Sequence, residues 1–154
     1  MKEIVDEKDR KILEILKEKS TLSTYKISKK TLIPVTTVNN RIKKLKKMGV
    51  IKKFTIEIDK NKLGFNLTAY ILINLSLKEL KEEKMNVRDL VRIIKRNPNI
   101  ESVDNVTGDM DIILKIHAGD INEINDYVVN TLAGLKGVEK TKTALILTKE
   151  MKSS

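Results

Sequence analysis

The second half of the chain consists of one strand–helix–strand unit written twice, and this repeat restricts the possible folds more than any other feature. Short apolar, β-branched runs alternate there with segments whose apolar residues recur at helical spacing. The expected strands span residues 68–77, 100–106, 111–117 and 138–148, and the expected helices span about 87–96 and 121–132. Two such units in succession predict a ferredoxin-like βαββαβ sandwich.

The predicted strands of this half are apolar on both sides. In the first strand, Ile71 and Ile73 alternate with Tyr70 and Leu72, and the last strand repeats the pattern. Helices packed on one face of a sheet cover only half of these side chains. A monomer would leave the other half as a large apolar surface in water, so we expect the chain to self-associate through this domain, at least as a homodimer.

The first part of the chain predicts three helices. Asp6 and Asp9 form an expected N-cap pair, and the apolar residues that follow recur with the i, i+3, i+4 spacing of one buried stripe. Ser23 is suited to cap the second helix, Pro34 is suited to the start of the third, and Gly49 stops it. The expected helices span about 6–19, 23–30 and 34–48. Two short helices joined by about four residues indicate a helix-turn-helix.

The segment between the two parts predicts a strand and a boundary. Residues 50–59 alternate well enough for a strand that forms a wing or a bridge, with Phe54 and Ile56 on its apolar side. Residues 59–66 are polar around Gly64 and indicate a linker. The chain is thus expected to be an α+β protein with a helix-turn-helix (winged-helix-like) domain at 1–53, a connecting strand and linker at 54–67, and the ferredoxin-like domain at 68–154.

The net charge of +10 is concentrated in one part of the chain. Residues 1–62 hold 18 basic and 8 acidic side chains, whereas residues 63–154 hold 13 of each. Between Glu18 and Glu57 there are eleven Lys or Arg and no acid. A field of this sign attracts a polyanion, which is nucleic acid or an anionic membrane surface.

The stretch VNNRIKKLKKMG, residues 38–49, holds five of these cations on the third predicted helix. Val38, Ile42 and Leu45 form its inward stripe, so the opposite side faces outward. Short polar groups lie toward the N-terminal end of that side, where helix-turn-helix proteins contact bases, and cations lie toward the C-terminal end. The predicted base contacts are Thr36, Thr37, Asn39 and Asn40, and the predicted phosphate contacts are Lys43, Lys44 and Lys47.

Two alternatives stay open for this helix. A Lys-rich helix face can simply be solvated, although the long acid-free run and the preceding helix favour DNA binding. Arg41 lies beside the buried stripe, so it either joins the DNA contacts or pairs with an acid of the first helix.

Several chemistries are excluded by composition. The chain has no Cys, which rules out disulfides and thiolate metal sites, and its single His, His117, rules out the usual zinc sites. We expect His117 to be exposed or locally bonded rather than catalytic. No P-loop, nucleophile elbow or HExxH motif is present, and no apolar run is long enough to cross a membrane. The expected protein is a cytoplasmic non-enzyme with no metal or cofactor and no membrane partner.

Four stretches resemble the Lrp/AsnC (feast/famine) family of transcriptional regulators, and the resemblance covers nearly the whole chain. They are VDEKDRKILEILKE, VNNRIKKLKKMGVIKKFTIEID, VTGDMDIILKI and LKGVEKTKTALIL. The resemblance implies a sequence-specific regulator that binds double-stranded DNA and carries a ligand-sensing C-terminal domain. The chain departs from the family pattern at Leu32, where the family commonly has a turn Gly, and at Ser28, Pro34 and Lys46.

The turn TGDMD has two interpretations. From local geometry it is a solvated hairpin in which Gly108 supplies a positive φ. The family resemblance implies instead that it lines a pocket for a small effector, usually an amino acid, at a contact between dimers. Asp111 can then pair with an α-ammonium group, and backbone N–H groups can receive the α-carboxylate. The candidate effector-binding residues are Gly108, Asp109, Met110, Asp111, Thr141 and Thr143.

Other functions compete with this one. The chain is alternatively a small-molecule-binding or catalytic ferredoxin-like protein whose basic N-terminal domain binds nucleic acid non-specifically. Binding of single-stranded nucleic acid is disfavoured because stacking needs exposed aromatic residues, and the chain has only three Tyr and two Phe. A metal site at Asp109 and Asp111 is disfavoured because no further ligands lie nearby.

Overall fold

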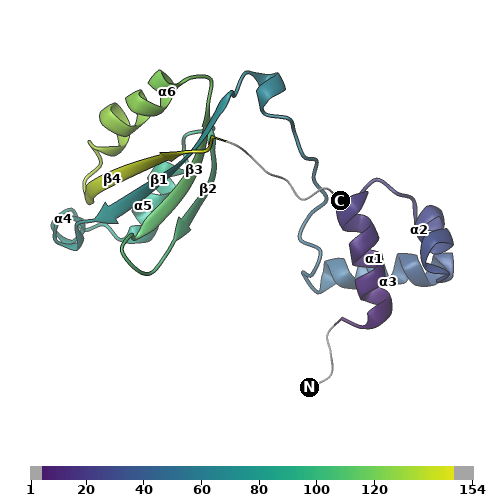
Figure 1. Ribbon diagram of the computed structural model, residues 1–154. Coiled ribbons are helices and arrows are strands. Elements are labelled where there is room, and N and C mark those ends of the chain that lie inside the picture. The colour runs from purple at the N-terminus through teal and green to yellow at the C-terminus, as the bar shows by residue number, and fades with distance from the viewer. Residues whose placement is uncertain (1–4, 148–154) are drawn as a thin grey trace. The chain divides into compact units, whose positions relative to one another are not determined.

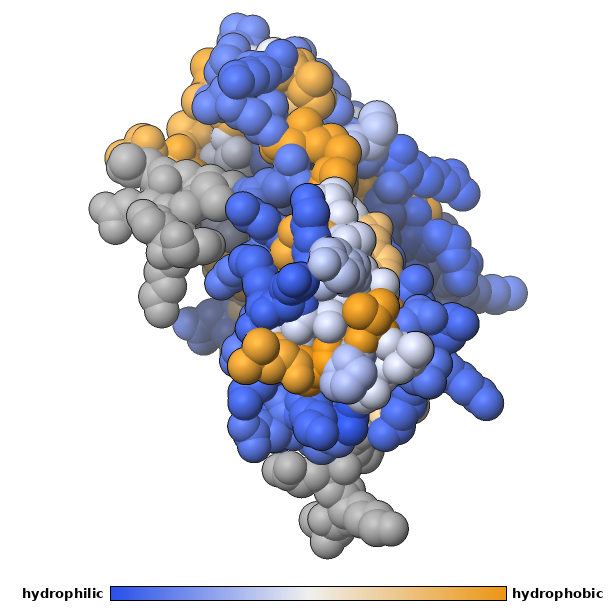
Figure 2. All heavy atoms as spheres, turned by 90° about the vertical axis from the view of Figure 1, so that its right-hand side faces the viewer, coloured by the Kyte–Doolittle hydropathy of each residue, from blue (hydrophilic) through white to orange (hydrophobic). Residues whose placement is uncertain are grey.

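The computed structural model describes residues 5–147, which form two compact units, 5–57 and 58–147 (Figure 1). Each unit has its own apolar core, and each is described by itself. Figure 2 shows one face of the molecule, where hydrophilic side chains predominate and apolar patches are small.

The N-terminal unit contains the three predicted helices, α1 (Glu7–Glu18), α2 (Thr24–Thr31) and α3 (Val35–Lys47). Asp6 and Asp9 form the expected capping box on α1, and Ser23 accepts a hydrogen bond from the N–H of Lys26 at the start of α2. The core is built from one side of each helix, with Ile12, Leu16, Ile27, Ile33 and Val38 buried. The predicted inward stripe of α3 is confirmed, since Val38 and Leu45 are buried and Ile42 packs against the core.

The turn between α2 and α3 is made without the glycine that the family commonly has there. Leu32 adopts the left-handed conformation, φ 57° and ψ 25°, and its side chain is 91% exposed. A left-handed conformation is unfavourable for a residue with a Cβ, so this turn carries backbone strain. Pro34 occupies the N-cap position of α3 and supplies no side-chain cap.

The prediction of a strand at residues 50–59 is wrong. Residues 52–58 have no secondary structure, and no strand occurs anywhere in residues 5–57. A strand forms only when a second strand completes its hydrogen-bond ladder, and residues 5–57 contain no second strand. Phe54, Ile56 and Ile58 consequently remain exposed. A 3₁₀ helix, η1 (Asn61–Leu63), follows and ends at Gly64 with φ 86°.

The C-terminal unit confirms the predicted βαββαβ order. Its strands are β1 (Leu67–Leu75), β2 (Ile100–Asn105), β3 (Ile112–Ala118) and β4 (Val138–Leu145). They form an antiparallel sheet with the order β2-β3-β1-β4, as in a ferredoxin-like sandwich. A short helix that the sequence pattern did not predict, α4, follows the first strand directly. The helices of this unit are α4 (Leu77–Glu82), α5 (Val87–Ile94), α6 (Ile121–Asp126) and the π-helix η2 (Tyr127–Leu132).

The core of this unit lies between the helices and one face of the sheet. Ile71 and Ile73 of β1 are fully buried in one cluster with Leu90 of α5 and Ile124 of α6. The opposite face contains the alternate residues of β1, among them Tyr70, which is 40% exposed. The expectation that one sheet face keeps apolar side chains in contact with solvent is therefore confirmed for the described residues.

Candidate DNA-binding and effector sites

The outward side of α3 presents the predicted DNA contacts to solvent. Six of the eight are exposed, whereas Thr37 and Arg41 are half-buried. The side chains of Asn39 and Asn40 make no hydrogen bond to any residue within 5–147, so their amides are free to pair with base edges. The exposed six are Thr36, Asn39, Asn40, Lys43, Lys44 and Lys47.

Arg41 has an internal partner, which is one of the two roles that the sequence left open for it. Its Nη1 donates to both carboxylate oxygens of Asp6 at 2.6 Å and to Oδ1 of Asp9 at 2.8 Å. The Asp9 side chain is only 1% exposed, whereas that of Asp6 is 50% exposed. The hydrogen bond from Arg41 lowers the pKa of Asp6, and the two carboxylates raise the pKa of Arg41. Arg41 thus connects α3 to the start of α1 in this structure.

Lys46 is also occupied within the N-terminal unit. Its ammonium group lies 4.6 Å from the centre of the Phe54 ring, which is a cation–π distance. This contact joins the end of α3 to the segment that follows it.

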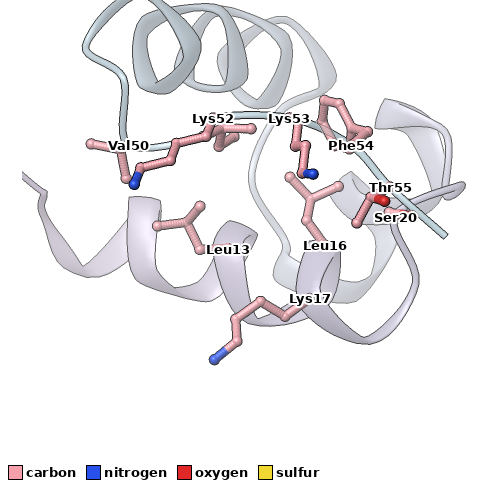
Figure 3. Close-up of a pocket in the computed structure, with 10 residues that line it drawn as sticks. Leu13, Leu16, Lys17, Ser20, Val50, Lys52, Lys53, Phe54 and Thr55 are labelled. Atoms are coloured by element: carbon pink, nitrogen blue, oxygen red, sulfur yellow. The ribbon is translucent and has the colours of Figure 1, made fainter. Parts of the chain in front are cut away.

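A groove of about 580 Å³ lies between α1 and the segment after α3 (Figure 3). Leu13 and Leu16 point into it from α1, whereas Lys17 points away. The groove brings together no cluster of catalytic groups. Sequence reasoning did not find it, because it exists only where segment 50–55 packs against α1. Its lining residues are Leu13, Leu16, Lys17, Ser20, Val50, Ile51, Lys52, Lys53, Phe54 and Thr55.

The TGDMD turn joins β2 to β3 and is attached to the end of β1. Gly108 has φ 123°, as expected for a glycine at this turn. The N–H of Asp111 donates to the carbonyl of Ile73 at 3.0 Å, and Oδ2 of Asp111 accepts from the N–H of Leu75 at 2.8 Å. Asp111 therefore has a structural partner in the same chain, and no hydrogen bond within residues 5–147 reaches its second carboxylate oxygen.

Asn74 also holds this turn, and the sequence analysis missed it. Its side-chain Nδ2 donates to the carbonyl of Asp109 at 2.6 Å. Residues 74 and 109 are far apart in the sequence, so only the register of β1 against β3 shows that they meet.

Thr141 and Thr143 lie on β4, on the other side of β1 from the turn. Thr141 is the register partner of Ile73 on β1, and the carbonyl of Ile73 accepts the N–H of Asp111. Strand β1 therefore lies between Thr141 and the turn. Thr143 pairs with Ile71, two positions farther along the strand. Within residues 5–147, no hydrogen bond joins either threonine to the turn.

His117 was expected to be exposed or locally bonded, and the structure shows that it is buried and locally bonded. Its Nδ1 lies 3.0 Å from Oγ1 of Thr68, and its Nε2 lies 2.5 Å from Oε2 of Glu101. Lys115 donates to the other oxygen of Glu101 at 2.9 Å, and this hydrogen bond is the main cause of a lowered Glu101 pKa. The cluster satisfies its own polar groups on the sheet face opposite the helices.

Residues 5–147 contain no candidate metal site and no membrane-spanning helix. No group of three or more His, Asp or Glu in this range is arranged to hold a metal ion. None of the helices in the same range is long and apolar enough to cross a bilayer.

Comparison with known proteins decides the family. Residues 68–154 match the model of the Lrp/AsnC ligand binding domain, and residues 5–52 match a winged helix-turn-helix DNA-binding model. The chain belongs to the Lrp/AsnC family. The resemblance inferred from the sequence motifs is confirmed, and this Lrp/AsnC protein is a transcriptional regulator rather than an enzyme.

Relatives of this Lrp/AsnC protein align over almost their full length. An uncharacterized HTH-type transcriptional regulator of Pyrococcus furiosus is 42% identical over 143 residues, which cover 93% of this chain and 91% of the relative. The HTH-type transcriptional regulator FL11 of the same organism is 34% identical, with coverage of 96% and 92%.

Solved structures share the fold of the whole chain. LrpC of B. subtilis has a TM-score of 0.84 and 25% identity, covering 97% of this chain and 99% of its own. A transcriptional regulator of Neisseria meningitidis in complex with L-Met has a TM-score of 0.86 and 23% identity, with coverage of 97% and 94%.

Proposed function

We propose that this Lrp/AsnC regulator binds specific double-stranded DNA sequences as a homo-oligomer and that an amino acid modulates its binding. The observation that carries the proposal is the outward side of α3, where short polar Thr and Asn side chains precede a row of exposed lysines. In this division of the chain, residues 1–53 bind DNA, 54–67 connect, and 68–154 assemble the protein and bind the effector. Its proposed place of action is the cytoplasm, where it meets DNA.

The two zones of α3 have different tasks on DNA. Asn39 and Asn40 can each accept and donate toward one base, and Asn pairs in this way with adenine. Lys43, Lys44 and Lys47 neutralise phosphates, which gives affinity for any duplex and a steep dependence on salt. Arg41 is assigned to the ion pair with α1 instead of the DNA, because both of its carboxylate partners lie within hydrogen-bond distance.

The open sheet face supports self-association. Tyr70 is 40% exposed, and its neighbours Leu72 and Ile113 are only partly buried. Leucine and isoleucine are residue types that are usually buried in the core. A second copy placed on this face would remove apolar area from water. A two-fold dimer would present two copies of α3, which matches an operator with two half-sites.

The effector assignment rests on the chemistry of the turn and on the fold. One oxygen of Asp111 is left for an ammonium group, and the N–H groups of Gly108, Asp109 and Met110 meet no acceptor within residues 5–147. This combination suits a zwitterion with one positive and one negative end. The L-Met complex of a structural neighbour supports an amino acid as the class of ligand.

A selection of bound DNA fragments tests the proposal. Purified protein is mixed with random duplex fragments, with and without each of the twenty amino acids, and the retained fragments are sequenced at two salt concentrations. We expect one enriched motif with two related half-sites, and a change in its enrichment with at least one amino acid. Retention of fragments without any shared motif would instead favour a non-specific basic domain attached to a small-molecule-binding unit.

A further inference from the structure

The end of β1 is hydrogen-bonded on one side to the TGDMD turn and on the other side to the loop before β4. Toward β3, the Asn74 side chain and the Leu75 N–H bind the TGDMD turn. Toward β4, the next N–H, that of Ser76, donates to the carbonyl of Gly137 at 3.0 Å. Three consecutive residues thus connect the turn to the loop that starts β4. Leu75 and Ser76 donate through their backbone N–H groups, whereas Asn74 donates through its side chain. The bond from Asn74 therefore depends on which residue occupies position 74.

The bond from Asn74 orients one peptide group of the turn. It holds the carbonyl of Asp109, which belongs to the same planar peptide group as the N–H of Met110. All peptide bonds of the described chain are trans, so this N–H points opposite to the carbonyl, away from β1. It meets no acceptor within residues 5–147. Fixing the carbonyl on β1 therefore aims the Met110 N–H outward.

We propose that Asn74 is a positioning residue for the effector: it aims the Met110 N–H at the ligand's carboxylate. This inference rests on the proposed binding of an amino acid at the turn, and it adds a residue outside the TGDMD motif to that site. Gly108 has φ 123° and no side chain, so the backbone at this glycine restricts the rotation of neighbouring peptide groups only weakly. A contact from outside the turn is therefore needed to fix their orientation. A donor at position 74 supplies that contact, and an acceptor there would repel the Asp109 carbonyl.

The variant Asn74→Asp tests whether a hydrogen-bond donor is needed at position 74, because aspartate has the same shape but a carboxylate that cannot donate. The matched control is Asn105→Asp at the end of β2, which adds the same charge before the same turn at an exposed position. Binding of the twenty amino acids, and of the α-carboxamide of the tightest one, is measured by calorimetry for both variants. Crystal structures of the two variants show the orientation of the Asp109–Met110 peptide.

We expect Asn74→Asp to bind the amino acid at least about tenfold more weakly than Asn105→Asp, because a hydrogen bond to a charged group is lost. The carboxamide oxygen still accepts a hydrogen bond but carries no charge, so Asn74→Asp should weaken carboxamide binding less than amino-acid binding, each relative to Asn105→Asp. The Asp109–Met110 peptide should be rotated in Asn74→Asp and unchanged in the control.

Two results would overturn the inference: equal losses for the amino acid and its carboxamide, or an Asp109–Met110 peptide with the same orientation in both variants. Failure of the proposed effector function is a separate result, in which the wild-type protein binds none of the amino acids. The crystal structures still decide in that case whether Asn74 orients the turn.

Discussion

The guanidinium of Arg41, on α3, lies 2.8 Å from the carboxylate of Asp9, on α1, and the Asp9 side chain is only 1% exposed. The helix proposed to contact DNA is thus connected by an ion pair to the first helix of the same unit. A buried carboxylate without its charge partner is strongly unfavourable, so this pair constrains the position of α3.

Arg41→Ala should lower the free energy of unfolding by about 2–3 kcal/mol, because the Asp9 carboxylate then stays buried without a counter-ion. Urea unfolding followed by circular dichroism measures the effect. Lys43→Ala is the control, since it removes a cation from the exposed side of the same helix and should change stability by less than about 0.5 kcal/mol. Unchanged stability of Arg41→Ala together with lost DNA affinity would assign Arg41 to DNA instead.

Asn40→Ala should weaken binding to preferred DNA sites far more than binding to random DNA, by about 1–3 kcal/mol, because a base contact carries sequence information. Lys47→Ala should weaken both by the same factor and reduce the salt slope by about one. Fluorescence anisotropy on two duplexes at several salt concentrations gives both quantities. Equal losses on the two duplexes for Asn40→Ala would remove it from the base contacts.

Asp111→Asn distinguishes the two roles of the turn carboxylate. The asparagine oxygen can still accept the N–H of Leu75, so stability should change by less than about 1 kcal/mol. Amino-acid binding should fall at least about tenfold, because the charge that pairs with the α-ammonium group is gone. The measurements are thermal unfolding and calorimetric titration. A variant that keeps full effector affinity would show that Asp111 only holds the turn.

Leu32→Gly should stabilise the N-terminal unit by about 0.5–1 kcal/mol, since glycine adopts the left-handed conformation of this turn without strain. Leu32→Ala is the matched control, because it removes the exposed side chain and keeps the strained backbone. Urea unfolding of both variants is compared. The strain assignment is wrong if the two variants are equally stable.

Gly137→Ala should destabilise the C-terminal unit by about 2 kcal/mol more than Gly64→Ala. The two glycines have similar conformations, φ 90° and 86°, but a Cβ at 137 would lie 2.3 Å from Cδ2 of Leu80, whereas one at 64 meets nothing within 4 Å. Leu80 is buried in the core and cannot move aside freely. Thermal unfolding measures the difference, and similar losses for the two variants would mean that the core yields at Leu80.

Features that depend on neighbouring residues were predictable from the sequence. The capping box of Asp6 and Asp9, the inward position of Val38 and Leu45, and the positive φ of Gly108 all follow from short-range spacing and residue type. Helical and strand periodicity determine which side of an element is apolar before any packing occurs. The same periodicity, repeated twice, was sufficient to predict the order of the ferredoxin-like unit.

Features that need a distant partner were decided only by the tertiary structure. The sequence predicted a strand at 50–59, which is absent because no second strand lies in its unit, and it left two roles open for Arg41. The register of β1 against β3 brings Asn74 to the turn and buries His117 between Thr68 and Glu101. The sequence by itself determined the three N-terminal helices, the βαββαβ order of the repeat and the charged face, because these depend on local spacing. The partners of Arg41, Asn74 and Asp111 depend on strand register and helix packing, which bring distant residues into hydrogen-bond distance.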